Sequence, residues 1–80
     1  MRRDKLEIAR NILLICKNGA KKTEIVYKAN LNFKNTEGYL KWLIDREIIM
    51  KEGKIFKITS KGSELLSNLQ NASAFMDWKL

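Results

Sequence analysis

The chain has 80 residues, with 16 Lys and Arg against 9 Asp and Glu, for a formal net charge of +7. That length fits one domain, which buries only about 60–65% of its unfolded surface, so chains of this size often gain stability by dimerising. One Cys and no His exclude the common zinc spacings and a Cys–His nucleophile pair, so we expect no metal, no cofactor and no enzyme activity.

The first predicted element is an amphipathic helix. Apolar residues recur at three- and four-residue intervals from Leu6 to Cys16, and Asp4 can cap the helix because its carboxylate can accept from a backbone N–H of the first turn. Asn18 and Gly19 end it, since glycine suits the left-handed conformation that follows many helices. Cys16 lies on the apolar stripe, so we predict a buried small hydrophobe.

Two further helices follow, with a tight turn between them. We expect residues 20–22 to form a short basic connection, and Thr23 to cap a second helix that ends at Asn30. Asn32 is a good cap for a third helix that runs to about Arg46. The apolar residues of this third helix fall on one side, which we predict to be buried: Tyr39, Leu40, Leu43 and Ile44.

A hairpin and a last helix complete the pattern. Two short β-type runs flank Glu52 and Gly53, which predicts a hairpin with a basic tip. Thr59 is predicted to cap the last helix, with Gly62 in its first turn. Apolar residues then recur as a coiled-coil seam, followed by large side chains that a monomer would leave uncovered. These residues predict a homodimer interface: Leu65, Leu69, Ala72, Phe75, Met76 and Trp78.

The order of elements predicts a mainly α (α+β) fold, namely a winged helix-turn-helix with three helices, a β-hairpin wing and a C-terminal dimerisation helix. The positive net charge favours a polyanionic partner. Residues 1–59 are therefore expected to form a winged helix-turn-helix DNA-binding domain, and residues 60–80 a C-terminal helix that serves as the dimerisation element.

Three blocks of sequence resemble the small archaeal winged-helix DNA-binding proteins. They are KKTEIVYKANLNF from Lys21 to Phe33, YLKWLI from Tyr39 to Ile44, and IFKITSKG from Ile55 to Gly62. The resemblance covers roughly residues 5 to 70. It implies a winged-helix fold, a homodimer paired through an antiparallel coiled coil of C-terminal helices, and binding to double-stranded DNA as a chromatin-like protein or a transcription regulator.

The chain departs from that family at four positions. Thr36, Glu37 and Gly38 stand where we expect an apolar residue followed by basic or long polar residues. Glu37 would repel phosphate if it faced DNA, and Gly38 costs the helix about 0.5–1 kcal/mol relative to Ala. Glu47 occupies a position where the family usually has glycine. Either the backbone approaches DNA closely at Gly38, or the third helix is a weaker reader than usual.

The candidate DNA contacts follow from the motif, in which the second helix of the pair lies in the major groove and the first crosses the backbone. Lys34 and Asn35 are expected to supply a modest sequence preference, whereas capping alone would explain Asn32. The remaining lysines would bind phosphates. Those of the wing are explained equally well as solvated charges that protect the hairpin edge from pairing with another strand. The predicted DNA-binding residues are Lys21, Lys22, Lys28, Asn32, Lys34, Asn35, Lys41, Lys51 and Lys54.

Two aromatic residues are harder to place. Tyr27 would either donate its hydroxyl to a phosphate or lie in the core. Trp42 borders the buried face of the third helix. We expect it to pack against the C-terminal helix of its own chain or of a partner, because a large exposed apolar side chain is unusual.

We expect a homodimer that binds double-stranded DNA, as a transcription regulator or as an architectural chromatin protein. Two alternatives stay open: a winged-helix protein-interaction module without DNA binding, and an RNA-binding protein. The longest apolar run, Ile12 to Cys16, is far shorter than the ~20 residues that span a bilayer, and the charged N-terminus is not a signal peptide. We therefore expect a cytoplasmic protein with no membrane partner.

Overall fold

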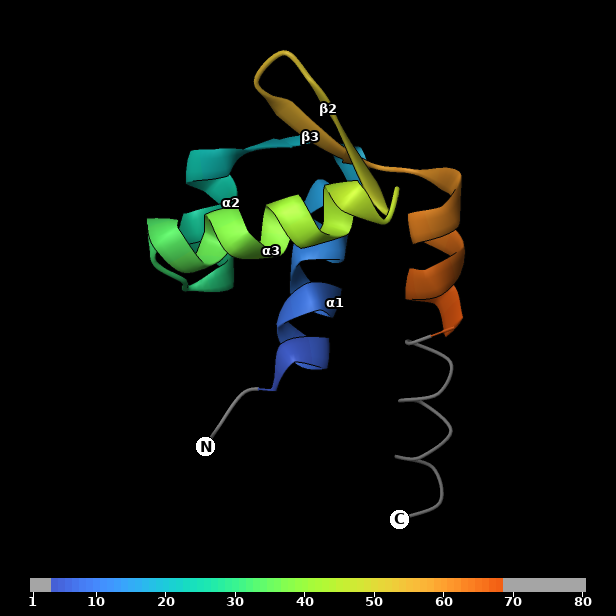
Figure 1. Cartoon of the computed structure of the whole chain (residues 1–80), viewed down its shortest axis with the longest axis horizontal. Coiled ribbons are helices and arrows are strands. Elements are labelled where there is room, and N and C mark those ends of the chain that lie inside the picture. The colour runs from blue at the N-terminus through green and yellow to red at the C-terminus, as the bar shows by residue number, and fades with distance from the viewer. Residues whose placement is uncertain (1–3, 69–80) are drawn as a thin grey trace.

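Helices and a small sheet make up the part of the chain that the structure, a computed structural model, describes: residues 4–68 (Figure 1). In chain order the elements are α1 (Lys5–Ile15), the 3₁₀ turn η1 (Cys16–Asn18), β1 (Ala20–Lys21), α2 (Lys22–Ala29), α3 (Phe33–Asp45), β2 (Ile49–Glu52) and β3 (Ile55–Ile58). A final helix starts at residue 60 and is described to residue 68. In Figure 1, α1 lies between α2 and this final helix, and the hairpin of β2 and β3 lies above α3.

The start of α1 is as predicted, and so is its buried side except at Leu6, which is 60% exposed. The Asp4 carboxylate accepts from a backbone N–H of the first turn at 2.8 Å. Ile12, Leu13 and Cys16 are completely buried. Burial raises the pKa of the Cys16 thiol to about 11, so at neutral pH this side chain is an uncharged, unreactive part of the core. Gly19 follows at φ +89°, which glycine adopts without strain.

Residues 20–22 are not the plain connection that the sequence predicted. The first two form β1, which pairs antiparallel with β3. α2 already starts at Lys22, so the predicted cap at Thr23 is wrong. The carboxylate of Glu24 instead accepts from the N–H of Lys21 at 3.3 Å and satisfies one of the unpaired donors at the helix start. A two-residue strand has no periodicity, so the local sequence could not reveal β1.

α3 is capped as predicted and buries the predicted side. The Asn32 amide oxygen accepts from the N–H of Asn35 at 2.7 Å. Thr36, at the position where an apolar residue was expected, is completely buried, and its hydroxyl donates to the Asn32 carbonyl at 2.8 Å. That hydrogen bond lets a polar side chain occupy a core position. The predicted face is buried or half-buried at all four residues: Tyr39, Leu40, Leu43 and Ile44.

The chain leaves α3 through a strained residue. The N–H of Glu47 donates to the carbonyl of Ile44, and the N–H of the next residue donates to that of Leu43, each at 2.9 Å. These two bonds form a Schellman turn, which places Glu47 at φ +60°. The left-handed conformation costs a residue with a side chain about 1–2 kcal/mol. The position where the related family usually has glycine is thus one where the backbone favours glycine.

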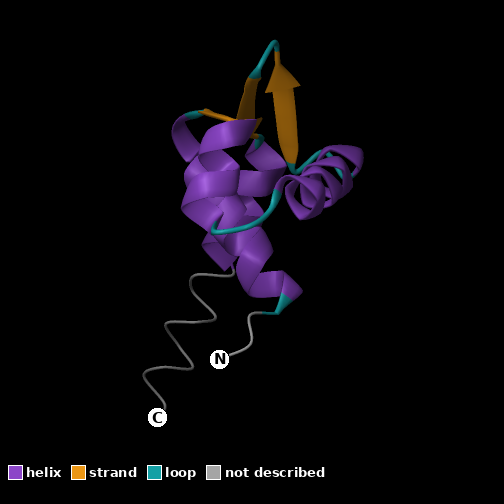
Figure 2. Cartoon of the chain, turned by 90° about the vertical axis from the view of Figure 1, so that its left-hand side faces the viewer, coloured by secondary structure: helices purple, strands orange, loops and turns teal. Residues whose placement is uncertain are grey.

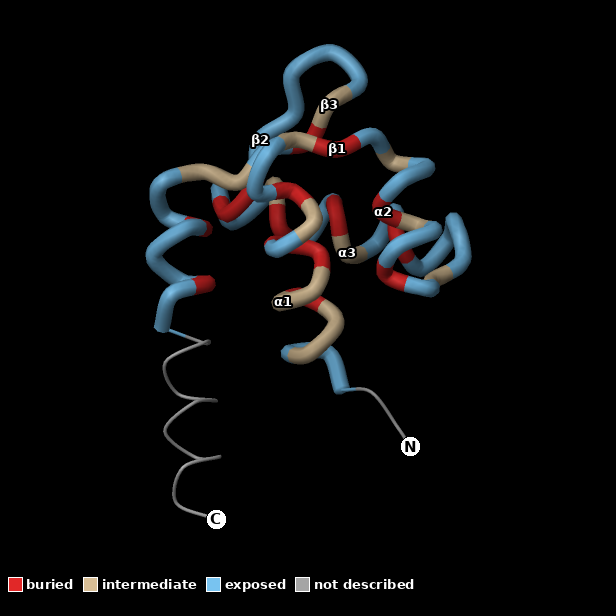
Figure 3. Tube along the Cα trace, turned by 180° about the vertical axis from the view of Figure 1, so that it is seen from behind, coloured by how far each residue is buried: buried red, intermediate tan, exposed pale blue. Residues whose placement is uncertain are grey.

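The wing is a two-residue hairpin whose turn is Gly53 and Lys54, one residue later than predicted, with Glu52 and Ile55 paired across it. β3 is the central strand of a sheet with the order β1-β3-β2. Its Phe56 side chain is buried in the core. Figure 2 shows the hairpin projecting from the helices, and Figure 3 shows that its tip is exposed while the buried stretches lie where the helices and the sheet meet.

The final helix is joined to the end of α3 through Ile48. Thr59 caps this helix, as predicted, because its hydroxyl oxygen accepts from the N–H of Gly62 at 3.0 Å. Its own N–H donates to the Ile48 carbonyl at 3.1 Å, and its hydroxyl lies 2.9 Å from the same oxygen. A Cβ at Gly62 would overlap that oxygen and come within 2.8 Å of Ile58. Leu66 is buried one turn later, so the helix belongs to the core.

Gly62→Ala is expected to lower the free energy of unfolding by about 1–3 kcal/mol, because backbone atoms must move to admit the methyl group. Urea unfolding followed by circular dichroism measures the change. Gly38→Ala is the matched control, since nothing lies within 4 Å of a Cβ at Gly38. There the same substitution is expected to stabilise α3 by about 0.5–1 kcal/mol. Equal effects at the two positions would contradict the close packing at Gly62.

Glu47→Gly is expected to raise the free energy of unfolding by up to about 1 kcal/mol. Relief of the left-handed strain outweighs the extra freedom that glycine gives the unfolded chain. Thermal unfolding of the two proteins makes the comparison. Asn30→Gly is the control, because Asn30 stands at φ +56° but asparagine tolerates this conformation, so its gain is smaller. A destabilised Glu47→Gly protein would be incompatible with this explanation.

Candidate nucleic-acid interface

α2 and α3 form the helix-turn-helix pair of the fold. Asn30 joins them in the left-handed conformation, and the N–H of Leu31 donates to the Val26 carbonyl at 3.0 Å. Ile25 of α2 and Leu43 of α3 are completely buried in the same core cluster. Because the pair is held by its apolar sides, the opposite side of α3 faces solvent.

The exposed side of α3 carries three charged residues in one row. Lys34, Glu37 and Lys41 are spaced by three and four residues, so they lie on the same side of the helix, and all three are exposed. Asn35 is exposed as well. The amide oxygen of Asn32 is engaged in the cap, so the capping explanation accounts for that residue. The row therefore offers two lysines and one carboxylate to a partner.

Lys22, at the start of α2, reaches across to α3. Its ammonium lies 3.2 Å from a Glu37 carboxylate oxygen and 5.8 Å from the centroid of the Phe33 ring. Phe33 is the first residue of α3 and is more than half exposed. Both the carboxylate and the face of the ring attract the cation. The sequence did not predict this arrangement, because the contacts join two different helices.

A cleft of about 430 Å³ between α3 and the wing gathers three of the predicted lysines. Lys22 of α2, Lys41 of α3 and Lys51 of β2 line it, together with Glu37. The ammonium of Lys51 lies 5.6 Å from the ring centroid of Phe56, part of the apolar lining. Three lysines against one carboxylate leave this lining with a net positive charge, which suits a phosphate.

The other predicted lysines are exposed but do not line this cleft. Lys21 lies in β1, Lys54 in the hairpin turn, and Lys28 pairs at 3.5 Å with a glutamate one turn earlier on α2. Tyr27 is 87% exposed, so the alternative that places it in the core is wrong. It stands two residues after the buried Ile25, on the opposite side of α2, and helical periodicity could have shown this.

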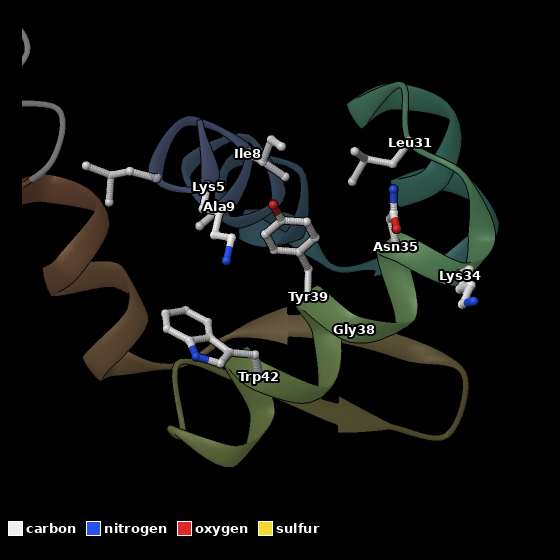
Figure 4. Close-up of a pocket in the computed structure, with 10 residues that line it drawn as sticks. Lys5, Ile8, Ala9, Leu31, Lys34, Asn35, Gly38, Tyr39 and Trp42 are labelled. Atoms are coloured by element: carbon white, nitrogen blue, oxygen red, sulfur yellow. The ribbon is translucent and has the colours of Figure 1, made fainter. Parts of the chain in front are cut away.

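An open groove of about 920 Å³ lies on the other side of α3, against α1 (Figure 4). Its apolar lining includes Leu6, Tyr39 and Trp42, and Lys34 and Asn35 also line it. The Trp42 side chain points into the space between the helices (Figure 4), with the guanidinium of a neighbouring arginine 4.2 Å from its ring. The sequence predicted that the C-terminal helix would cover Trp42. This side chain is 45% exposed, so residues 60–68 of that helix leave part of it uncovered.

The predicted dimer interface overlaps the described chain at one position. Leu65 is 36% exposed, beside the buried Leu66. The other predicted interface residues lie outside the described residues: Leu69, Ala72, Phe75, Met76 and Trp78. Within residues 4–68, no helix has both the length and the hydrophobicity needed to cross a membrane.

The helix-turn-helix pair, the adjoining wing and the exposed row on α3 define a winged helix-turn-helix protein. The chain belongs to the winged helix-turn-helix family, whose profile matches residues 2–77. The predicted fold class is thereby confirmed.

Two similar proteins come from Methanocaldococcus jannaschii. The uncharacterized protein MJ0290 is 39% identical over 71 residues, which cover 88% of this chain and 34% of that protein. The uncharacterized protein MJ0287 is 35% identical over 79 residues, which cover 98% of this chain and 81% of that protein. The chain therefore spans about a third of the length of the first relative and most of the second.

A solved structure shares the fold. The crystal structure of Sso10a-2, a DNA-binding protein from Sulfolobus solfataricus, matches with a TM-score of 0.80 and 26% sequence identity. The match covers 94% of this chain and 83% of Sso10a-2. The resemblance to small archaeal winged-helix DNA-binding proteins that the sequence indicated is confirmed.

Proposed function

We propose that this protein binds double-stranded DNA, with α3 in the major groove and the wing against the flanking backbone. The observation that carries the proposal is the cleft between α3 and the wing, where Lys22, Lys41 and Lys51 come from three elements to line one space. Phosphate contacts supply most of the affinity of such interfaces, and clustered ammonium groups attract them. The likeness to Sso10a-2, a DNA-binding protein, supports the same function.

Base contacts are proposed for the first turn of α3. Lys34 and Asn35 are exposed there, where a recognition helix meets base edges. Lysine can donate to guanine O6 and N7, and asparagine can pair with adenine. Lys21, Lys28 and Lys54 extend the basic surface on either side and are proposed as phosphate contacts.

We further propose that the protein acts as a homodimer, with residues 1–59 as the DNA-binding domain and residues 60–80 as the dimerisation element. Leu66 faces the core while the neighbouring Leu65 is partly exposed, so the final helix has apolar residues on two sides. The sequence continues that second side with further apolar residues. A dimer would double the basic face and suits either a transcription regulator or an architectural chromatin protein, without catalytic chemistry.

Binding to duplex DNA is expected to fall steeply with salt. A dimer that neutralises ~8–12 phosphates should give a slope of roughly −7 to −11 for log affinity against log salt concentration. Fluorescence anisotropy of a labelled duplex between low and moderate salt measures this slope. Lys41→Ala and Lys51→Ala should each weaken binding to all sequences and make the slope shallower by about 1 per protomer.

Lys61→Ala is the matched control, because Lys61 is exposed on the final helix and does not line the cleft. It should leave the affinity and the slope nearly unchanged. The double variant Lys34→Ala with Asn35→Ala separates the two roles, since loss confined to one sequence indicates a regulator and a uniform small loss an architectural protein. No duplex binding at low salt would exclude the proposed function and favour a protein-interaction module.

Sedimentation equilibrium at tens of micromolar is expected to give twice the monomer mass of 9.3 kDa. Leu65→Gln should shift the protein toward monomer, because it places a polar amide on the apolar seam. Leu14→Gln is the control, since Leu14 is also an exposed leucine but lies on α1. A monomeric mass for the unaltered protein would refute the dimer.

A further inference from the structure

Glu37 places a negative charge in the middle of a basic face. It stands between Lys34 and Lys41 in the exposed row of α3, and its carboxylate lies 3.2 Å from the ammonium of Lys22. The Glu37 side chain is 63% exposed. A carboxylate at this place repels every phosphate that approaches the cleft, so it opposes non-specific binding to DNA.

The fold does not need this ion pair. Exposed ion pairs contribute little to stability, because water screens both charges and two long side chains lose freedom. α2 and α3 are already joined by the buried Ile25 and Leu43. A role for Glu37 must therefore be sought in what the exposed face binds.

We propose that Glu37 is a specificity-determining residue that selects cytosine in the major groove; this inference rests on the proposed function. An ionised carboxylate only accepts hydrogen bonds. Guanine offers acceptors on its major-groove edge, thymine an acceptor and a methyl group, and adenine a donor beside an acceptor. Cytosine alone offers its N4 amino group without an adjoining acceptor on the same base. The carboxylate of Glu37 is thus attracted at cytosine and repelled at guanine and thymine, while at adenine the attraction of the N6 amino group is opposed by the adjoining N7 acceptor.

The surroundings of Glu37 leave room for a base edge. The next residue is Gly38, and nothing lies within 4 Å of the position that a Cβ would occupy there. Gly38 therefore lets the helix approach the floor of the groove closely beside Glu37. The cost of a glycine in mid-helix, which the fold does not explain, is consistent with such an approach.

Lys22 couples base recognition to phosphate binding. In the free protein its charge is held by Glu37 at 3.2 Å. When the carboxylate turns to a cytosine amino group, Lys22 becomes available to a phosphate in the adjoining cleft, which it also lines. On other sequences the ion pair stays closed, and Lys22 contributes little to binding. The ion pair lowers the affinity for unrelated DNA. It thereby widens the difference in affinity between sites that present a cytosine to Glu37 and sites that do not.

A selection on random duplexes at moderate salt, followed by titration, tests the inference. The unaltered protein should enrich a cytosine at one position of each half-site, and replacing that C·G pair by T·A should weaken binding about tenfold. Glu37→Ala should lose this preference, bind random duplexes more tightly, and show a salt slope steeper by about 1 per protomer, because Lys22 then reaches a phosphate. Glu37→Gln should move the preference away from cytosine, since its amide also donates.

Glu64→Gln is the matched control, because it removes the same charge from the exposed surface of the final helix. It should change neither the preference nor the slope, and thermal melts should show that all variants fold alike. A Glu37→Ala protein that keeps the preference for cytosine, whether or not its affinity rises on every sequence, overturns the inference and leaves the proposed function standing. If no form binds duplex DNA at low salt, the proposed function itself fails.

Discussion

The backbone of Ile48 joins the three parts of the molecule on which the proposed function depends. Its N–H closes the turn that ends α3, its side chain is buried, and the wing begins at the next residue. Its carbonyl accepts from Thr59 and lies against Gly62, where a Cβ has no room. The directions of α3, the wing and the final helix are therefore set at one peptide unit. Glu47, the residue before it, is held in a strained conformation there.

The distribution of charge matters more than the net charge of +7. Several lysines of the helix-turn-helix and the wing are partly neutralised by neighbouring carboxylates, as Lys22 is by Glu37 and Lys57 is by Glu52 at 3.9 Å. The cleft beside α3 keeps a net positive charge, because Lys22, Lys41 and Lys51 line it against the single carboxylate of Glu37. The opposite side of α3 borders an apolar groove, so the helix separates a surface suited to phosphate from one suited to apolar packing.

Taken alone, the Glu37 carboxylate on α3 opposes DNA binding, because a negative charge repels phosphate. Its contact with Lys22 gives the same carboxylate a second effect, because it also holds the charge of that lysine. Under the proposed function, Glu37 holds the charge of Lys22 until a base releases it, which reduces binding to unrelated DNA and favours that base. The ion pair of Lys22 and Glu37 would then lower the overall affinity for DNA while raising the selectivity. Its two side chains are 34% and 63% exposed.

The caps at Asp4, Asn32 and Thr59, the burial of Cys16, and the order of helices and hairpin could be predicted from the sequence alone. These features depend on residues within a few positions of one another, so local periodicity and capping chemistry reveal them. Four other features could be known only from the folded chain: the strand β1, the contact of Lys22 with Glu37, the convergence of three lysines, and the need for glycine at position 62. Each of these depends on how closely segments distant along the chain approach one another, and packing of the common core sets those distances.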